Sequence, residues 1–490
     1  MKGVKQQKTM FRIILSAALL GLAQTVRADG FNPSVDELLD TGLKLVQIVT
    51  VGGEEPTCEA VQAPEGCWGV GTTNKTKVQA RMTIQQGENV LYDSGEYQKD
   101  ESGVQVSLRG NQSALMDKKS YKLKLQKKAD LLLRGDKTYN DKQWALIKDE
   151  ESNLISLNTL VGFKVGQLAG LQWVPSLEYV NVLLNGDYKG VYMLVETVKE
   201  GSHRVDVDKA GGYIIEYDAY WWNEELCLDE GRWYYYAPMR YTFKYPDADD
   251  ITQEQTDYIQ RRVDDMELSI EEGTYEQQID VESFAAWLMA HDILGTADNG
   301  GSNIFLTLHD NGEEAKFQMG SLWDMDSIER MEDDWSRVHL MWGFYFYQLF
   351  NSRNLAFMAA YWQKWLKMSP RLVSLMDTFL DGFAASEQGQ GLDRAMQFDA
   401  RRWGYTAKTV AGEVSRNKSW FKARKAWLDR NVPVQCAPYL NYLVDVRQLE
   451  VQEPAATGRV YDLWGRKATP RSRGLLLKAN RKYTQKSDRR

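Results

Sequence analysis

The sequence predicts an α+β fold with two lobes, in which a strand-rich lobe precedes a helical lobe. Residues 41–52 and 120–126 alternate between apolar and polar side chains, which is typical of half-buried strands. Residues 338–432 are rich in Trp and have helical spacing almost throughout. The chain has 490 residues, 43% of them hydrophobic, which is enough for about two or three domains with a large core.

Strand-like segments fill the first lobe. They are residues 41–52, 77–85, 89–94, 104–110 and 120–126, followed by a hairpin over 178–198 with an Asn-Gly-Asp turn. A helix is predicted over 153–169 and should end at Gly170, because glycine readily takes the left-handed conformation of a helix C-terminus. Aromatic-rich segments at 211–222 and 232–247 complete the lobe.

The helical lobe is predicted to begin after Pro246, where the sequence becomes charged and helical. Asp280 is suited to cap a helix over residues 281–294. His291 and Asp292 in this helix superficially resemble a catalytic pair. We interpret His291 as structural, because the acidic turn that follows comes later in the chain.

Residues 291–326 contain a group of side chains that are suited to catalysis or metal binding. Asp298 and Asn303 are separated by a glycine pair, and Asp324 and Asp326 follow a strand-like hairpin. The spacing D-x-x-x-x-N is that of the protein-kinase catalytic loop. In that loop the Asp accepts the proton of the attacking hydroxyl, and the Asn together with a later Asp holds magnesium ions.

A solvated acidic loop is the alternative explanation of this pattern, and such a loop is more often surface than site. The context favours a site, because apolar segments at 304–308 and 317–323 bracket the acids. Two acids at positions i and i+2 directly after Trp323 are hard to explain by solubility. A strand-rich lobe followed by a helical lobe suits a kinase-like cleft between the two lobes.

Three motifs resemble the CotH kinase family (spore coat protein H), over roughly residues 100–330. They are HDILGTADNGGSNIFL with MGSLWDMD, RGNQSALMDKKSYKLKL, and LLNGDYKGVYMLVE. The resemblance implies an atypical protein-kinase fold and Mg-ATP-dependent phosphorylation of protein substrates. It implies Asp298 as the catalytic Asp, and Asp324 and Asn303 as metal ligands. Ser321 stands where a proline is common in the family.

A kinase needs a basic residue on a strand to hold the nucleotide phosphates. Lys122 or Lys124, which share one face of the strand 120–126, is suited to this role, and Arg109 is suited to assist. An exposed sheet face that carries lysines for solubility is the alternative. A glycine-rich G-x-G-x-x-G loop and a P-loop are both absent from the sequence, which argues against an ordinary kinase or P-loop protein.

Glu196 is predicted to bind nucleotide or to pair with a lysine, and a structural salt bridge is the alternative. The helix over 153–169 has no acid with which to form the Lys–Glu pair usual in kinases. In the family resemblance, Lys244 is a phosphate or core contact.

Residues 1–28 are expected to be an export signal. A basic start precedes an apolar stretch too short to span a bilayer, and a cleavage site follows at residues 26–28. No later run reaches membrane-spanning length, so we expect no transmembrane segment. These features predict an exported protein of the periplasm, cell surface or extracellular space.

The net charge of −8 combines basic ends with an acidic body. Such a body argues against nucleic acid as a partner, because phosphates bind basic surfaces. It suits a basic protein substrate, although ordinary solubility is the simpler explanation. The sequence identifies neither the substrate nor the oligomeric state.

Cys58 and Cys67 lie nine residues apart in a turn-rich stretch, which predicts a local disulfide in an exported protein. Cys227 and Cys436 have no evident partners. Zinc is not expected, because the sequence has no C-x-x-C and only four scattered His.

The predicted organisation is a signal peptide, a strand-rich N-lobe, a helical C-lobe with the catalytic loop, and a basic tail, at residues 1–28, 29–248, 249–440 and 441–490. Residues 457–486 resemble the C-terminal sorting signals of exported Bacteroidetes proteins, and a disordered basic tail is the alternative.

These features predict an exported CotH-like atypical protein kinase that transfers phosphate from Mg-ATP to protein hydroxyls, with Asp326 supporting the metal ligands. One alternative is a pseudokinase or surface binding module that uses the aromatic segment 220–236. Another is a magnesium-dependent phosphohydrolase, which would use the same acids with water as the acceptor.

Overall fold

The computed structural model describes residues 30–148, 155–232, 238–296, 302–329 and 344–451, together with three short strands near the C-terminus. The chain divides into two compact units, Met1–Arg430 and Asn431–Arg490. The first combines a strand-rich region with a helical region, in agreement with the predicted α+β class. The predicted signal peptide and Asp298 lie outside the described residues.

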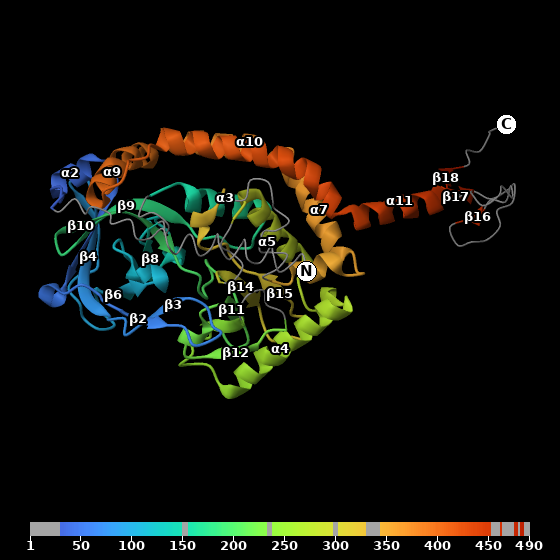
Figure 1. Ribbon diagram of the computed structural model, residues 1–490, viewed down its shortest axis with the longest axis horizontal. Coiled ribbons are helices and arrows are strands. Elements are labelled where there is room, and N and C mark those ends of the chain that lie inside the picture. The colour runs from blue at the N-terminus through green and yellow to red at the C-terminus, as the bar shows by residue number, and fades with distance from the viewer. Residues whose placement is uncertain are drawn as a thin grey trace. The chain divides into compact units, whose positions relative to one another are not determined.

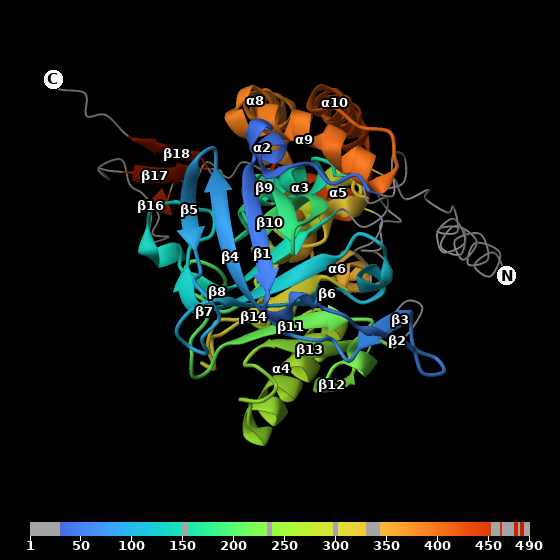
Figure 2. The same ribbon diagram turned by 90° about the vertical axis from the view of Figure 1, so that its left-hand side faces the viewer.

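Seven strands of the first unit close into a barrel (Figure 2). The ring runs in the order β1-β9-β10-β8-β7-β6-β4 and returns to β1, and β5 extends it beside β4. The strands are β1 (Lys44–Thr50), β4 (Val78–Gln86), β5 (Asn89–Asp93), β6 (Val104–Arg109), β7 (Ser120–Ala129), β8 (Asp141–Ile147), β9 (Leu177–Leu184) and β10 (Asp187–Glu196). Only β1 and β9 pair in parallel, because an odd number of strands cannot close with antiparallel pairs alone.

Alternate residues of every barrel strand point inward and fill the interior with apolar side chains. On β7, for example, Tyr121, Leu123 and Leu125 belong to this core, which also contains Trp144 from β8. Each fully buried Val or Leu contributes about 1.5–3 kcal/mol to stability. Lys122 and Lys124 are exposed on the outer face of the barrel, as the alternation predicted.

A second, five-stranded antiparallel sheet has the order β12-β13-β11-β14-β15. Its strands are β11 (Tyr213–Asp218), β12 (Cys227–Glu230), β13 (Arg240–Tyr245), β14 (Ile304–Leu308) and β15 (Phe317–Met319). The sheet thus joins strands from both sides of residue 248, where the sequence predicted the boundary between lobes.

The hairpin of β2 (Glu59–Gln62) and β3 (Val70–Thr73) corrects the predicted disulfide, because Cys58 and Cys67 are both free thiols. Glu59 pairs with Thr73 at the open end of this hairpin, and Gln62 pairs with Val70 near its turn. Cys58 therefore lies at the open end and Cys67 in the turn. A separation of four or five strand residues is roughly 15 Å, far beyond the reach of a disulfide.

Helices cover the two sheets of the first unit (Figure 1), and the last of them, α10, continues past Arg430 into the second unit. They are α2 (Val35–Asp40), α3 (Asn158–Ala169), α4 (Gln253–Glu272), α5 (Val281–Leu294), α6 (Phe346–Asn351), α7 (Ala356–Met368), α8 (Leu372–Ala385), α9 (Glu387–Trp403) and α10 (Val410–Gln435). Two predicted helix ends agree with the structure: α3 stops at Gly170 with φ of 86°, and the Asp280 carboxylate accepts the Ser283 N–H at the start of α5. Among the described helices, none combines the length and apolarity that crossing a bilayer requires.

His291 and Asp292 lie in the interior of α5 and have structural surroundings. The His291 ring packs on Trp287 with 3.9 Å between ring centroids, and burial lowers its pKa to about 3. The Asp292 carboxylate accepts the Tyr361 hydroxyl at 2.6 Å. The structure therefore agrees with the interpretation of His291 as structural.

The helix α9 is joined to the barrel by a fully buried ion pair. The Lys118 ammonium lies 2.8 Å from the Asp399 carboxylate, and both side chains are 0% exposed. The same carboxylate oxygen accepts the N–H of Val191 on β10 at 2.8 Å, and the Tyr405 hydroxyl donates to the other oxygen. Because Gly190 has no side chain, the β10 backbone can approach Asp399 closely.

The helix α3 packs tightly against the segment that contains Asp324. A Cβ atom on Gly162 would lie 2.5 Å from Cγ of Met325, and one on Gly166 would lie 3.0 Å from Leu322. Glycine at these two positions therefore allows the helix to approach Leu322 and Met325 on either side of Asp324.

We expect Gly162→Ala to destabilise the protein by about 1–3 kcal/mol, because the added methyl group overpacks the contact with Met325. Thermal unfolding measures the effect. Gly382→Ala in α8 is the matched control, since its Cβ would meet nothing within 4 Å. The control should be neutral or gain up to about 1 kcal/mol from helix propensity. Equal effects of the two substitutions would contradict the close packing of α3.

The second unit contains α11 (Ala437–Val451) and a three-stranded antiparallel sheet. The strands are β16 (Tyr461–Asp462), β17 (Leu475–Lys478) and β18 (Arg481–Thr484). The predicted tail at 441–490 thus contains short strands, and its role as a sorting signal stays a prediction.

Candidate active site

Asn303 joins the second sheet to Asp324. It directly precedes β14 and has φ of 63°, a left-handed conformation that is uncommon for residues other than glycine. Its backbone N–H donates to the Glu216 carboxylate at 2.9 Å, and its side-chain amide donates to Asp324 Oδ2 at 3.1 Å. Two residues that the sequence predicted as metal ligands are therefore in direct contact.

Asp324 is half-buried at the start of a 3₁₀ turn, Met325–Ser327, and also has a left-handed backbone, with φ of 58°. Burial raises the pKa of its carboxyl group, while the positive charges of Arg109 and Lys148 and the hydrogen bond from Asn303 oppose that rise. The Arg109 guanidinium lies over the ring of Trp323, 4.6 Å from its centroid. The carboxylate is suited to hold a metal cation, and the two cations are suited to hold the anionic part of the same ligand.

Glu216 and Asp218 on β11 form the acidic side of the site. The Glu216 carboxylate lies 2.7 Å from the Lys244 ammonium. Asp218 accepts the Ser302 hydroxyl at 3.1 Å. Burial, followed by the neighbouring charge of Glu216, raises the pKa of Asp218 to about 7. Burial alone would lower the pKa of Lys244, but Glu216 and the other nearby carboxylates outweigh this and raise it.

Lys148 acts on Asp324, and Lys75 lies near Arg109, so the cations of this region come from different parts of the barrel and its hairpin. Lys148 follows β8, is only 3% exposed, and donates to the Met116 sulfur at 3.1 Å. Lys75 follows the β2–β3 hairpin and donates to the Gly110 carbonyl at 2.8 Å. Burial lowers the pKa of Lys75, and Glu224 opposes this shift while Arg109 adds to it. Such a group of cations is suited to bind phosphate oxygens.

The structure brings most of the predicted cations near this site. The Lys122 side chain is exposed on the outer face of β7, but neighbouring groups partly desolvate it and so lower its pKa. The charges of Arg109, Lys124 and Lys244 lower this pKa further, and Asp247 opposes the shift. Lys122 is therefore part of the same positive region, with Lys124 two residues further along the outer face of β7. The backbone carbonyl of Asp326 accepts the Asn158 side chain at 2.7 Å, which fixes the turn after Asp324.

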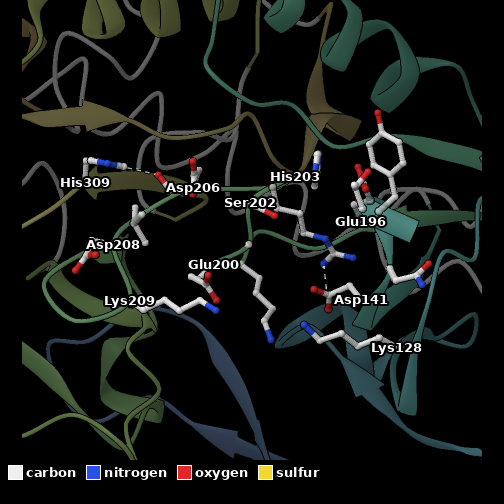
Figure 3. A pocket seen from close by; sticks show the side chains of 17 residues that line it. Lys128, Asp141, Glu196, Glu200, Ser202, His203, Asp206, Asp208, Lys209 and His309 are labelled. Carbon is white, nitrogen blue, oxygen red and sulfur yellow. Dashed lines mark hydrogen bonds and ion pairs between the residues drawn. The ribbon is translucent and has the colours of Figure 1, made fainter. Parts of the chain in front are cut away.

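Glu196 lies in different surroundings, at the end of β10. One carboxylate oxygen accepts from Arg134 at 2.9 Å and the other accepts the Ser176 N–H at 2.9 Å. This is the structural salt bridge that the sequence left open, with an arginine in place of a lysine. Figure 3 shows Glu196 among the side chains that line a cavity, which also include His203 and Lys128.

This cavity, about 480 Å³ in volume, has lining side chains of both charges. His309 and Lys209 line it, at the end of β14 and just before β11 (Figure 3). Asn303 and Asp218 occupy the opposite ends of the same two strands. Six strand residues span about 20 Å, so the cavity and the Asn303–Asp324 pair are separate places.

Sequence reasoning missed Glu216, Asp218 and Lys148. A signal for the two acids exists in the segment YIIEYD, where they occupy alternate positions of an otherwise apolar and aromatic strand. Acids at alternate positions of such a strand face the same side and need buried partners. No comparable signal marks Lys148, whose burial depends on how the barrel packs.

The aromatic segment proposed as a binding flap is engaged within the protein where it is described. The Trp221 indole donates to the Pro238 carbonyl at 2.9 Å, and the Trp222 indole donates to the Trp68 carbonyl at 3.0 Å. A Cβ on Gly71 would lie 2.9 Å from the Trp222 ring, so the β2–β3 hairpin packs directly on it. Residues 233–237 of the segment lie outside the described residues.

The donor atoms present fit a magnesium ion. The side-chain oxygens of Asn303 and Asp324 are hard ligands of the kind that magnesium prefers. The Asn303 amide nitrogen makes the hydrogen bond to Asp324, so the amide oxygen is available to a cation. Within the described ranges, no group of three or more His, Cys, Asp or Glu is arranged to hold a metal. The third predicted carboxylate, Asp298, is outside those ranges.

Comparison with known proteins supports the resemblance seen in the sequence. The family model of the CotH kinase protein matches residues 106–428. A search of the curated proteins found no match. Among solved structures, the crystal structure of the Helicobacter pylori proinflammatory kinase CtkA is similar at 13% sequence identity with a TM-score of 0.24, over 56% of this chain and 90% of that chain. Because the family match spans more than half of its length, the chain belongs to the CotH kinase protein family.

Proposed function

We propose that this protein is a kinase of the CotH family that transfers the γ-phosphoryl group of Mg-ATP to a hydroxyl of a protein substrate. The observation that carries the proposal is the contact between Asn303 and Asp324 beside the cations Arg109 and Lys148. Phosphoryl transfer requires mainly positioning and neutralisation of negative charge. The family match supports the same class of reaction.

Each part of the site has a task in this proposal. Asn303 and Asp324 would hold the magnesium ion, which neutralises phosphate charge when bound. Arg109, Lys148 and Lys122 would bind phosphate oxygens. Asp298, between α5 and Ser302 in the chain, would accept the proton of the substrate hydroxyl. We include in this proposal that the strand-rich region and the helical region form the two lobes of a kinase-like fold.

Export through residues 1–28 is part of the proposal, and it places the activity in the periplasm, at the cell surface or outside the cell. The acidic body of the chain suits a basic protein substrate there. A supply of ATP in that compartment is a requirement of the function.

The test uses residues 29–490 with Mg-ATP labelled at the γ-phosphate and, in parallel, at the α-phosphate. We expect γ-label on protein, lost in the Asp298→Ala variant. Protein-bound α-label would show nucleotidyl transfer and overturn the proposal. Steady loss of ATP without a labelled protein would indicate a phosphohydrolase. Absence of both label and nucleotide binding would indicate a binding module.

A further inference from the structure

Two buried acids of β11 face the site but belong to none of the roles assigned above. Glu216 and Asp218 are 8% and 5% exposed and lie on the same face of the central strand of the second sheet. Tyr217 between them packs on the opposite face, with its ring centroid 5.3 Å from that of Tyr241. Burying a carboxylate costs free energy unless it is hydrogen-bonded or paired with a cation, so the partners of these two acids indicate their role.

Each acid has a partner at the start of β14, and Asp218 also accepts the Tyr220 N–H at 2.8 Å and the Thr242 hydroxyl at 3.3 Å. Glu216 accepts the Asn303 N–H at 2.9 Å and the Lys244 ammonium at 2.7 Å. Asp218 accepts the Ser302 hydroxyl at 3.1 Å, and the Ser302 hydroxyl oxygen in turn accepts the Ala219 N–H at 3.4 Å. Three groups near the end of β11, the two carboxylates and the Ala219 N–H, thus hold the two successive residues Ser302 and Asn303 at the start of β14.

These contacts are needed because the backbone of Asn303 has an unfavourable conformation. Its left-handed φ costs an asparagine of order 1 kcal/mol and persists only where the surroundings impose it. The conformation directs the side-chain amide to Asp324, 3.1 Å away. A small change at Ser302 or at the Asn303 N–H would move that amide.

We propose that Glu216 and Asp218 are positioning residues that hold Ser302 and Asn303 so that the Asn303 amide meets Asp324 and the Lys244 ammonium stays beside them. This proposal rests on the proposed function, because its purpose is to align the groups that bind Mg-ATP. Both acids act through their neighbours. A buried ion pair adds little net stability compared with apolar side chains in the same place, so stability alone does not explain why acids occupy these two positions.

The test compares Glu216→Gln, Asp218→Asn, Ser302→Ala and the double variant Asp218→Asn with Ser302→Ala. Replacing residues that orient a ligand typically lowers activity by about 10–100-fold. We expect kcat of each single variant to fall by that factor. The unfolding temperature should stay nearly unchanged in Asp218→Asn and Ser302→Ala, whereas Glu216→Gln should lower it because Lys244 loses its counter-charge. If Asp218 acts through Ser302, the double variant should have no lower kcat than Asp218→Asn alone.

Glu267→Gln is the matched control. Glu267 on α4 is another buried glutamate that accepts a backbone N–H and a side-chain group, from Arg232 at 2.9 Å and Tyr345 at 2.7 Å. The kcat of the Glu267→Gln variant should equal that of the wild type. Unchanged kcat in Glu216→Gln and Asp218→Asn would overturn the proposal, as would independent, multiplicative losses in the double variant.

Hydrogen–deuterium exchange of the peptide over residues 302–308, without nucleotide, separates this proposal from the proposed function. We expect faster exchange in Glu216→Gln and Asp218→Asn than in Glu267→Gln. Absence of phosphoryl transfer in the wild type would refute the proposed function, and faster exchange would still support the anchoring of Asn303. Equal exchange in all variants would overturn the proposal that Glu216 and Asp218 hold Asn303 in place.

Discussion

Asp324→Ala is expected to raise the dissociation constant for Mg-ATP at least about 100-fold, because the carboxylate is the proposed metal ligand and lies near the charges of Arg109 and Lys148. The fold should survive, since burial already disfavours the ionised carboxylate and its removal takes away that cost. Equilibrium binding of ATP with and without magnesium measures the first effect. Thermal unfolding measures the second.

Asp310→Ala is the control for this substitution. Asp310 lies in the loop between β14 and β15, where its carboxylate accepts the Gly312 N–H at 2.7 Å. Binding of Mg-ATP to the control should match that of the wild type. Magnesium-dependent binding that persists at full strength in Asp324→Ala would refute the assignment of Asp324 as a metal ligand.

Asp399→Ala is expected to destabilise the protein by about 3–5 kcal/mol, because it leaves the Lys118 ammonium buried without its counter-charge. The substitution also removes the acceptor of the Val191 N–H in β10. A loss of this size is a large fraction of the roughly 5–15 kcal/mol by which an ordinary domain is stable. Denaturant unfolding followed by circular dichroism measures the change.

The exposed pair of Lys418 and Asp381 provides the comparison. Its nitrogen and oxygen are 2.6 Å apart, but the Asp381 side chain is 66% exposed. Asp381→Ala should cost no more than about 1 kcal/mol, because water screens a surface ion pair. Similar losses in the two alanine variants would contradict the dominant role of burial at Asp399.

The strands of the barrel were largely predictable, but its closure was not. Alternation of apolar residues marked β1, β4, β6 and β7, whereas β8 escaped notice because its first half, Asp-Lys-Gln, is polar. Closure depends on the pairing of β1 with β4 and β9, and pairing between distant strands leaves no local pattern in the sequence. The Cys58–Cys67 prediction failed for a related reason, because spacing along the chain did not reveal the register of the hairpin.

The chemistry of the site was predictable where a motif fixed it. The sequence indicated Arg109, Asn303 and Asp324, and the structure brings them to one place. It did not indicate Glu216, because no motif spacing links a residue of β11 to one 87 positions later. Sheet pairing makes that link, and only the folded chain shows it.

Closure of the barrel also decides where another chain can attach to it. Every strand of the ring has hydrogen-bonding neighbours on both sides, so the ring itself offers no unpaired backbone to an incoming strand. The added strand β5 is the exception and forms the open edge of this sheet. Val90 and Leu91 on that edge are 58% and 42% exposed. Among the described strands of this sheet, β5 is therefore the one at which a strand of another chain would find unpaired backbone.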